Sequence, residues 1–412
     1  MNNETGIEYW KKLIVVLCFG WVAIWIYRTV LTPIYPEIQA ALGGISDTEI
    51  GFIATFYYGA YCSGQVPASL AVEKFGQKLT LLCGFGLFTV GTLVIGSASG
   101  ISMVYTGSLF SGLGCATFFC SAYSLSGENV PENRRAFASA IVNSGAAIGM
   151  GIGLIGSSVL VKSMNLAWNY VLYFSAAVIF IMFIVFALMI KPRENEPVRV
   201  KEAHAPTPVP EGGGSNLLSL ELVTVYFLYF CTCYGYYMIV TWLPSYLQTE
   251  RGFEGAAIGG ASALVAMVAV PGALFFSSLA DKFKAHTVKL VIALEVMAAL
   301  MLTFTVLASN TSVLMISLVV YGFLGKMALD PILIAFVTER APKARMARAL
   351  ALFNLSGMSS SIVAPPLTGF ISDITGSKAI GFYLSAGLLV SGAIIFTLVY
   401  LRGSTKATVQ AA

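Results

Sequence analysis

Four ionisable residues interrupt stretches of the sequence that are otherwise apolar: Arg28, Glu295, Lys326 and Asp330. If those stretches cross a membrane, each such side chain costs roughly 2.5–3.5 kcal/mol near the centre of the bilayer on insertion scales. It then faces a partner or a water-filled cavity, which makes these residues candidates for binding a charged ligand or a proton. For Glu295 three roles stay open: an ion pair, a reach toward the interface, or proton binding.

Arg28 lies on a stripe of polar and aromatic residues. Thr32 and Tyr35 follow it at i+4 and i+7, and Trp25 and Trp21 precede it at i−3 and i−7, which places all five on one helix face. A guanidinium is always charged and binds a carboxylate through two parallel hydrogen bonds. The stripe therefore predicts a cavity wall on which Arg28 binds a substrate carboxylate. The alternative is a structural ion pair with a carboxylate of another helix.

Lys326 and Asp330 are four residues apart, so on a helix they share one face. In one interpretation they only neutralise each other. In the other, a proton that binds Asp330 frees Lys326 for an anion, or an anion that binds Lys326 frees Asp330 for a proton. Because each charge sets the protonation of the other, such a pair couples two ligands. We predict substrate binding for Lys326 and proton coupling for Asp330.

The composition shows which elements must position these residues. Of the 412 residues, 57% are hydrophobic and 11% are charged, whereas soluble domains average about a quarter charged residues. A chain this apolar needs lipid as its solvent. Runs of about 20 apolar residues, the length that crosses a bilayer, recur twelve times, at 11–36, 47–72, 78–98, 102–127, 136–161, 168–190, 220–247, 255–280, 287–308, 311–338, 346–373 and 379–402.

Several classes of protein are excluded by the same inventory. The net charge is +4 and the basic residues lie in short loops, so no surface suits a nucleic acid. The seven cysteines fall in apolar runs and the two histidines in loops, without the spacing of metal ligands. No histidine cluster, nucleophile elbow or phosphate loop is present. We therefore expect neither an enzyme nor a bound metal or cofactor.

Basic residues predict the topology. Residues 191–218 are rich in proline, glycine and charge, and we interpret them as a cytoplasmic linker between an N-terminal bundle (1–190) and a C-terminal bundle (219–412). With both termini inside, nineteen of the 24 Lys and Arg residues lie on the cytoplasmic side, and Lys162, Arg251 and Lys378 lie outside. The predicted location is the cell inner membrane.

The two halves repeat each other. Matching residues lie 208 to 211 positions apart: Pro36 and Pro244, Gly51 and Gly259, Glu73 and Asp281, Glu128 and Glu339, Arg134 and Arg345, Asn143 and Asn354. The repeat predicts an all-α membrane protein in which twelve transmembrane helices form two pseudo-symmetric bundles of six. Parallel repeats of this kind place a substrate site near the midplane between the halves.

The repeat also indicates roles for polar residues outside the apolar centres of the helices. Acidic and basic residues at repeated cytoplasmic helix ends predict a gate of interlocking salt bridges, made by Glu73, Asp281, Glu128, Arg134, Arg135, Glu339 and Arg345. By the 208 offset, Tyr236 is the counterpart of the arginine on the first helix.

Three tyrosines and two amides complete the predicted substrate site. Tyr57, Tyr61 and Tyr236 can pack against an apolar substrate body and donate hydrogen bonds to it. The alternative for these rings is ordinary packing between helices. Asn143 and Asn354 either contact substrate or bond across helices.

Two loops resemble a family signature. Residues 69–78 read SLAVEKFGQK and residues 277–284 read SSLADKFK. Both resemble the major facilitator signature, Gly-x-x-x-Asp-Arg-x-Gly-Arg-Lys, although the first copy has Glu73 for the Asp and Ser69 for the leading Gly. The resemblance implies the major facilitator fold, in which helices 1, 4, 7 and 10 line the central cavity.

Within that superfamily, residues 234–247 and 354–377 resemble the anion:cation symporters, which carry organic anions. The helix 1 arginine of that group matches Arg28. Tyr27 stands where an acidic residue often precedes this arginine, and a second arginine often found on helix 4 is absent. The glycine-rich fifth helix resembles the antiporter motif but has Met150 in place of its proline, and close helix packing is a sufficient role for those glycines.

Together these features predict a secondary transporter that imports a small organic anion, a carboxylate, coupled to protons by alternating access. One co-transported proton would cancel the charge of a monoanion, whose entry the membrane potential opposes by about 2.3 kcal/mol per 100 mV. The first alternative is an organic-anion exchanger, and the second is a drug or metabolite exporter. The expected partners are the anion, protons and the lipid bilayer, and the expected state is a monomer.

Overall fold

The computed structural model describes residues 3–131, 134–191, 217–342 and 345–410, and in this part of the chain every regular element is helical. The first half contains α1 (Asn3–Val30), η1 (Thr32–Ile34), α2 (Tyr35–Ala41), α3 (Asp47–Phe75), α4 (Gln77–Gly96), α5 (Ile101–Asn129), α6 (Arg135–Ser157), η3 (Ser158–Ser163) and α7 (Asn169–Met189). The second contains α8 (Leu220–Arg251), α9 (Ala256–Lys282), η4 (Lys284–His286), α10 (Thr287–Leu307), α11 (Thr311–Leu324), α12 (Lys326–Arg340), α13 (Met346–Thr375) and α14 (Ala379–Gln410).

These helices coincide with the predicted apolar runs. Eleven segments of the described chain are helical, long and apolar enough to cross a membrane. The twelfth predicted run forms α3, a helix of 29 residues whose mean hydropathy is lowered by Tyr57, Tyr58, Tyr61 and Gln65. The predicted fold class, an all-α membrane protein, is confirmed.

Large apolar side chains cover the outside of the helices. Leu188 is 78% exposed, Leu274 68% and Ile316 62%. In water, a surface with many such residues would drive association. In a bilayer these side chains meet lipid tails, so their exposure is that of a membrane protein.

Two predicted runs are not single helices. The run predicted at 11–36 ends its α-helix at Val30 and continues as η1 and α2, where Pro33 and Pro36 have no backbone N–H to donate. The run predicted at 311–338 is broken at Gly325, whose ψ of −151° takes the backbone out of the helical region. Lys326 is therefore the first residue of a new helix rather than the middle of a long one.

The chain forms two compact units. Unit 1 comprises Met1–Arg193, Val240–Ala266 and Pro365–Lys378, and unit 2 comprises Glu194–Ile239, Met267–Ala364 and Ala379–Ala412. The bundle boundaries predicted near 190 and 219 stay a prediction, since residues 192–216 of the predicted linker lie outside the described residues.

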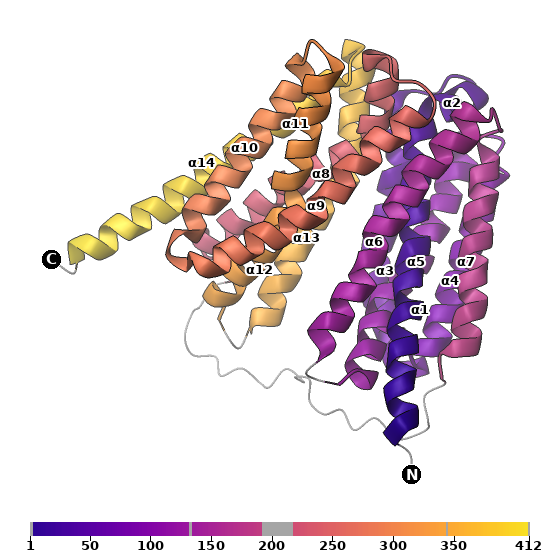
Figure 1. Ribbon diagram of the computed structural model, residues 1–412, viewed down its shortest axis with the longest axis horizontal. Helices are drawn as coiled ribbons and strands as arrows, with labels where there is room; N and C mark the ends of the chain where they lie inside the picture. The colour runs from indigo at the N-terminus through magenta and orange to yellow at the C-terminus, as the bar shows by residue number, and fades with distance from the viewer. Residues whose placement is uncertain (1–2, 132–133, 192–216, 343–344, 411–412) are drawn as a thin grey trace. The chain divides into compact units, whose positions relative to one another are not determined.

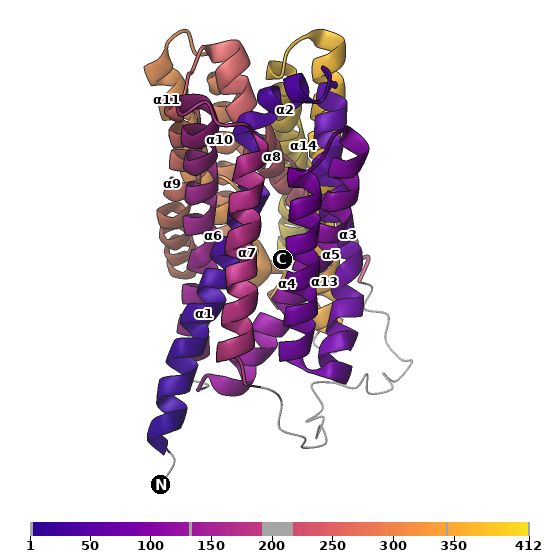
Figure 2. The ribbon, with the colours of Figure 1, turned by 90° about the vertical axis from the view of Figure 1, so that its right-hand side faces the viewer.

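In unit 1, α1 packs along α6, α3 packs on α5, and α4 lies between α5 and α7 (Figures 1 and 2). Three glycines explain the close contact of α1 and α6. A Cβ atom on Gly145, Gly149 or Gly153 would meet the backbone of α1, whereas Gly151 and Gly156 face open space. The packing role predicted for the glycines of this helix is confirmed for the first three. This contact fixes the helix that bears Arg28.

In unit 2, α10 packs against α11 and α14. The part of α8 that belongs to this unit contacts α13 through Tyr229 and Phe353, whose stacked rings have centroids 3.8 Å apart. These helices surround the ionisable residues of the second half.

Candidate functional site

Arg28 lies two residues before the end of α1 with its guanidinium half-buried. Its Nε donates a hydrogen bond to the hydroxyl of Tyr57 at 3.0 Å, and one terminal nitrogen lies 3.8 Å from Sγ of Cys115. Among the residues that the structure describes, no carboxylate forms an ion pair with this arginine. The structural ion pair considered as the alternative role is therefore not formed with any described residue.

Aromatic rings surround the guanidinium instead. The rings of Trp25 and Tyr61 are closest, with centroids 5.0 and 4.8 Å from Cζ of Arg28, and those of Trp21, Tyr57 and Tyr58 lie 5.8, 5.6 and 5.5 Å away. A cation near ring faces gains about 0.5–2 kcal/mol per favourable contact. The rings stabilise the charge without neutralising it, so the positive potential is left available to an anion.

A small cavity opens beside Arg28. It is lined by Tyr27, Arg28, Leu31, Thr32, Tyr35, Ile53, Ala54, Tyr57, Tyr58, Val240 and Thr241, all of unit 1. The stripe predicted on the first helix thus reaches a cavity through Arg28, Thr32 and Tyr35, although α1 ends at Val30, between the first and second of these residues. Tyr61 lies against the guanidinium rather than in this lining.

Lys326 and Asp330 form the predicted ion pair, with Nζ 2.5 Å from Oδ2 and side chains 12% and 22% exposed. The rings of Tyr236 and Tyr229 have centroids 5.4 and 5.7 Å from the ammonium nitrogen. As the first residue of α12, Lys326 places its charge at the positive end of a helix dipole, which raises its need for a counter-ion. The other carboxylate oxygen of Asp330 is buried and has no hydrogen-bond partner among the described residues.

The two predicted amides lie on α6 and α13. Oδ1 of Asn143 accepts a hydrogen bond from the hydroxyl of Tyr123 at 2.6 Å, which joins α6 to α5. Asn354 is exposed on α13. For Asn143 the observed bond is the one across helices, and substrate contact stays a prediction for both residues.

The residues of the predicted cytoplasmic gate occupy helix ends. The carboxylate of Glu128 accepts hydrogen bonds from Gln77 at 2.6 Å and Ser124 at 3.2 Å, and Arg135 donates to the carbonyl of Gly127 at 2.9 Å. Glu73 lies in the last turn of α3, and Arg134 precedes α6. The function of these residues as a gate stays a prediction.

In unit 2, Asp281 and Glu339 line one cavity together with Lys284. Glu339 also lies 3.7 Å from Arg340 in an exposed ion pair. Arg345 is half-buried just before α13. Two of the predicted gate acids therefore lie at one cavity of unit 2.

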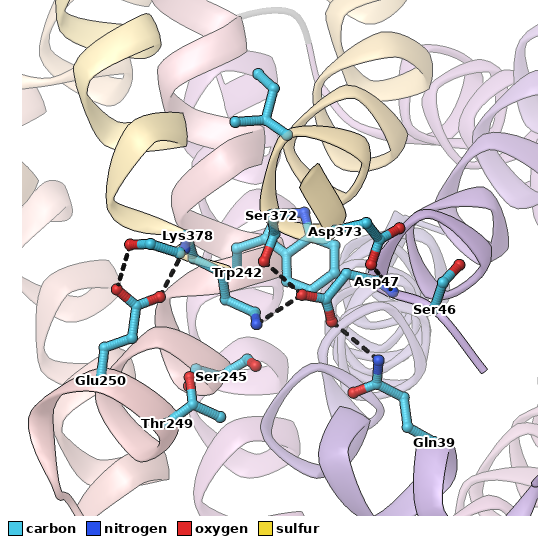
Figure 3. A network of polar contacts seen from close by, with 12 residues as sticks. Gln39, Ser46, Asp47, Trp242, Ser245, Thr249, Glu250, Ser372, Asp373 and Lys378 are labelled. Atoms are coloured by element: carbon cyan, nitrogen blue, oxygen red, sulfur yellow. Dashed lines mark hydrogen bonds and ion pairs between the residues drawn. The ribbon is translucent and has the colours of Figure 1, made fainter. Parts of the chain in front are cut away.

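A polar cluster that the sequence did not predict lies at the opposite helix ends of unit 1 (Figure 3). Asp47, at the start of α3, pairs with Lys378 at 2.7 Å and accepts hydrogen bonds from Ser372 at 2.6 Å and Gln39 at 2.9 Å. Glu250 accepts from the backbone of Lys378 at 2.6 Å. Both carboxylate oxygens of Asp47 thus accept hydrogen bonds, which offsets the desolvation of this buried ion pair.

Two further contacts extend this cluster. Asp373 accepts hydrogen bonds from the backbone N–H groups of Asp47 and Thr48 at the start of α3. Lys162 pairs with Glu37 and also bonds Gln248, each at 2.6 Å. In the sequence, the two lysines served only as markers of the outer side. The signal that points to their role is that each lies at a helix end within reach of acids at other helix ends.

The chain is similar to known transporters over most of its length. The family described as the Major Facilitator Superfamily matches residues 17–365 and 293–412. The chain belongs to this superfamily. It is therefore a membrane transporter and not an enzyme. The resemblance to the anion:cation symporters is supported by its relatives, which are named as transporters of organic acids.

One relative is a putative tartrate transporter of Agrobacterium vitis, 26% identical over 87% of this chain and 86% of its own length. Another is the 3-(3-hydroxy-phenyl)propionate transporter of Escherichia coli (strain K12), 23% identical over 89% and 91%. Among solved structures, a bacterial homologue of the human lysosomal transporter Spinster, in an inward-facing and occupied conformation, matches with a TM-score of 0.79 at 12% identity, over 95% of this chain and 96% of that one. This last likeness shows the fold.

Proposed function

We propose that this protein imports a small organic anion, a carboxylate, into the cell across the inner membrane, with both termini in the cytoplasm. Transport would proceed by alternating access and be coupled to protons. The names of the relatives support the substrate class, because tartrate and 3-(3-hydroxyphenyl)propionate are both carboxylates at neutral pH. They differ in charge and in aromatic character, so they span the chemistry to be tested.

The observation that carries the proposal is the uncompensated guanidinium of Arg28. A buried charge normally has a counter-ion, because desolvation without one is costly. Here the described part of unit 1 offers aromatic rings, one hydroxyl and one thiol to this group. A carboxylate that binds it restores the missing charge and gains two parallel hydrogen bonds.

Proton coupling is assigned to the Lys326–Asp330 pair. While the pair is closed, Lys326 is neutralised at 2.5 Å and offers little attraction to an anion. A proton on Asp330 removes the negative charge and exposes the ammonium. The pair then links proton binding to anion attraction in unit 2, which a transporter needs to move an anion against the membrane potential.

The test is a thermal-shift measurement on the purified protein in detergent. Tartrate and 3-(3-hydroxyphenyl)propionate are added to wild type, to Arg28→Ala and to Arg251→Ala. Arg251 is a matched control because its Nε also donates to a tyrosine hydroxyl, that of Tyr246 at 2.6 Å, and its guanidinium lies 5.3 Å from that ring. A ligand at 100 times its Kd stabilises the folded state by about 2.7 kcal/mol.

We expect at least one of the acids to raise the melting temperature of wild type and Arg251→Ala but not that of Arg28→Ala. The neutral amide of the same acid should have no effect on any of the three. A response to the acid that survives in Arg28→Ala would remove the anion site from this arginine. Uptake by proteoliposomes then separates import from exchange, because a proton-coupled importer accumulates the acid under a pH gradient and an exchanger needs only an anion on the other side.

A further inference from the structure

Among the described acidic and basic residues, Glu295 is the most deeply buried, and the proposed mechanism does not use it. It lies in the middle of α10 with none of its surface exposed. One carboxyl oxygen is hydrogen-bonded to the hydroxyl of Thr232 on α8, and the other has no partner among the described residues. No described lysine or arginine pairs with it. Of the roles left open by the sequence, the ion pair and the reach toward the interface are therefore not what the structure shows.

The hydrogen bonds around Thr232 favour the acid form of this carboxyl. A threonine hydroxyl has one proton to donate. That hydroxyl also lies 2.9 Å from the backbone carbonyl of Leu228, which can only accept. If Thr232 donates to Leu228, Glu295 must donate to Thr232, and it can do so only when protonated. The acid form satisfies every polar proton of this group, whereas the ionised form leaves an unpaired charge in an apolar core.

The titratable neighbours provide no counter-ion. Cys231 and Cys233 of α8 and Tyr321 of α11 are close enough to interact electrostatically with Glu295, and each is neutral in its ordinary form. On α12, Lys326 and Asp330 neutralise each other. The remaining titratable residues in the sequence of the packed elements η4, α10 and α14 are Lys284, His286, Lys289, Tyr383, Tyr400, Arg402 and Lys406.

Thr232 connects this carboxyl to the surroundings of Lys326. Tyr229 and Tyr236 precede and follow Thr232 on α8 by three and four residues, so the three share one helix face. The rings of both tyrosines lie within 5.7 Å of the ammonium of Lys326. Gain or loss of the proton of Glu295 would change the hydrogen bond between α10 and this stretch of α8.

We propose that Glu295 is a second proton-binding site of the transporter, which holds its proton in the conformation described here and exchanges it with water during the transport cycle, while Thr232 transmits the change to α8. The carboxyl takes the proton from water on one side of the membrane and returns it to water on the other. This inference rests on the proposed proton coupling, but it concerns a different residue from Asp330 and does not require Arg28 to bind the anion.

Infrared spectroscopy of the purified protein tests the proton directly, without a substrate. The wild type should show the carbonyl stretch of a protonated, buried carboxyl, and Glu295→Gln should lack that band. Asp330→Asn and Glu221→Gln should keep it, the second being a matched control because Glu221 is exposed at the start of α8 in the same unit. A spectrum of Glu295→Gln in which the protonated-carboxyl band is unchanged overturns the proposal.

Transport decides whether that proton moves. In proteoliposomes loaded and tested with tartrate and 3-(3-hydroxyphenyl)propionate, one coupled proton drives about tenfold accumulation for each pH unit of gradient. Glu295→Gln should lose this accumulation and keep counterflow at equal pH. Accumulation equal to that of wild type shows a static acid and overturns the proposal, even where the infrared band is present.

Two further measurements apply if Glu295→Gln does not fold or if the wild type transports neither acid. If Glu295→Gln does not fold, Thr232→Val replaces it: loss of the hydroxyl should shift the pH at which the wild-type infrared band disappears, and a band that titrates as in wild type contradicts the proposed link. If neither acid is transported by the wild type, the proposed function fails for these substrates, while the infrared titration still decides the protonation of Glu295.

Discussion

The surroundings of Arg28 in unit 1 and of Lys326 in unit 2 are alike in one respect and opposite in another. Each is a cation near a helix end, with tyrosine rings within 6 Å of its charge. Lys326 has a carboxylate at 2.5 Å, four residues along its own helix. Arg28 has a hydroxyl at 3.0 Å and no carboxylate among the described residues.

This difference separates two tasks that a coupled transporter must perform. A cation that is already paired has to be released before it attracts an anion, so its affinity depends on a second event such as protonation. An unpaired cation attracts an anion at any time. We therefore propose that anion capture takes place in unit 1 and the proton-dependent step in unit 2. Variants that change one charge at a time test this proposal.

The largest effect is expected on stability when Lys326 is replaced by Met. The variant leaves the carboxylate of Asp330 without its partner, and removal of one member of a buried pair costs about 3–5 kcal/mol. Because this pair is partly exposed, we expect a loss of about 2 kcal/mol. Arg28→Met removes a charge whose stabilisation by aromatic rings and whose desolvation cost oppose each other, so it should change the free energy of unfolding by less than about 1 kcal/mol. Denaturant unfolding in detergent measures both.

The double variant Lys326→Met/Asp330→Asn provides the control for this prediction. It removes both charges, so it should recover most of the stability that Lys326→Met loses. Equal losses in Arg28→Met and Lys326→Met would mean that the arginine has a structural partner after all, and the contrast between the two regions would be wrong.

The sequence predicts the two cations better than their surroundings. Arg28 and Lys326 stand out because charges are rare in apolar runs, and the spacing of Lys326 and Asp330 alone indicates their pairing. Tyr57 and Tyr61 are predicted as residues of the substrate site, but their contact with the guanidinium of Arg28 is seen only in the structure. Cys115 does not, because nothing local indicates that α5 approaches α1 at that point.

Two features of the structure depend on backbone geometry or on contacts between distant segments, and the sequence does not predict them. The hydropathy of residues 311–338 is continuous, so it does not reveal that Gly325 leaves the helical region. Asp47 and Lys378 are 331 positions apart in the sequence, and only the fold brings the start of α3 and the segment between α13 and α14 together, so that the two charges lie 2.7 Å apart. The fold follows from hydropathy summed over whole segments, whereas each of these contacts depends on single residues.

An intermediate effect is expected when the cation without a counter-ion is Lys326 in unit 2 instead of Arg28 in unit 1. Asp330→Asn removes the counter-ion of Lys326, which should then attract an anion by itself. In the background of Arg28→Met, where anion binding is lost, Asp330→Asn should restore affinity for 3-(3-hydroxyphenyl)propionate by about tenfold, the value of one charge-assisted hydrogen bond. Thermal shift measured with increasing concentrations of this acid gives the affinity.

The matched control for this exchange is Arg28→Met/Asp281→Asn, which removes an acid from the same unit but not from the ion pair. It should bind the acid no better than Arg28→Met. An equal gain in both double variants would mean that overall charge, and not the opening of the pair, accounts for the effect.

The smallest effect is expected from Tyr57→Phe, which tests whether the tyrosine hydroxyl orients the guanidinium of Arg28. The variant keeps the ring beside Arg28 and removes the hydroxyl that accepts from Nε. Without that bond the guanidinium has more freedom, and binding must restrict it. A neutral acceptor of this kind contributes about 0.5–1.5 kcal/mol, so the affinity for the acid should fall by about threefold to tenfold. Tyr246→Phe removes the same kind of acceptor from Arg251 and should leave the affinity unchanged. Tighter binding in Tyr57→Phe would show instead that the tyrosine competes with the anion for the guanidinium.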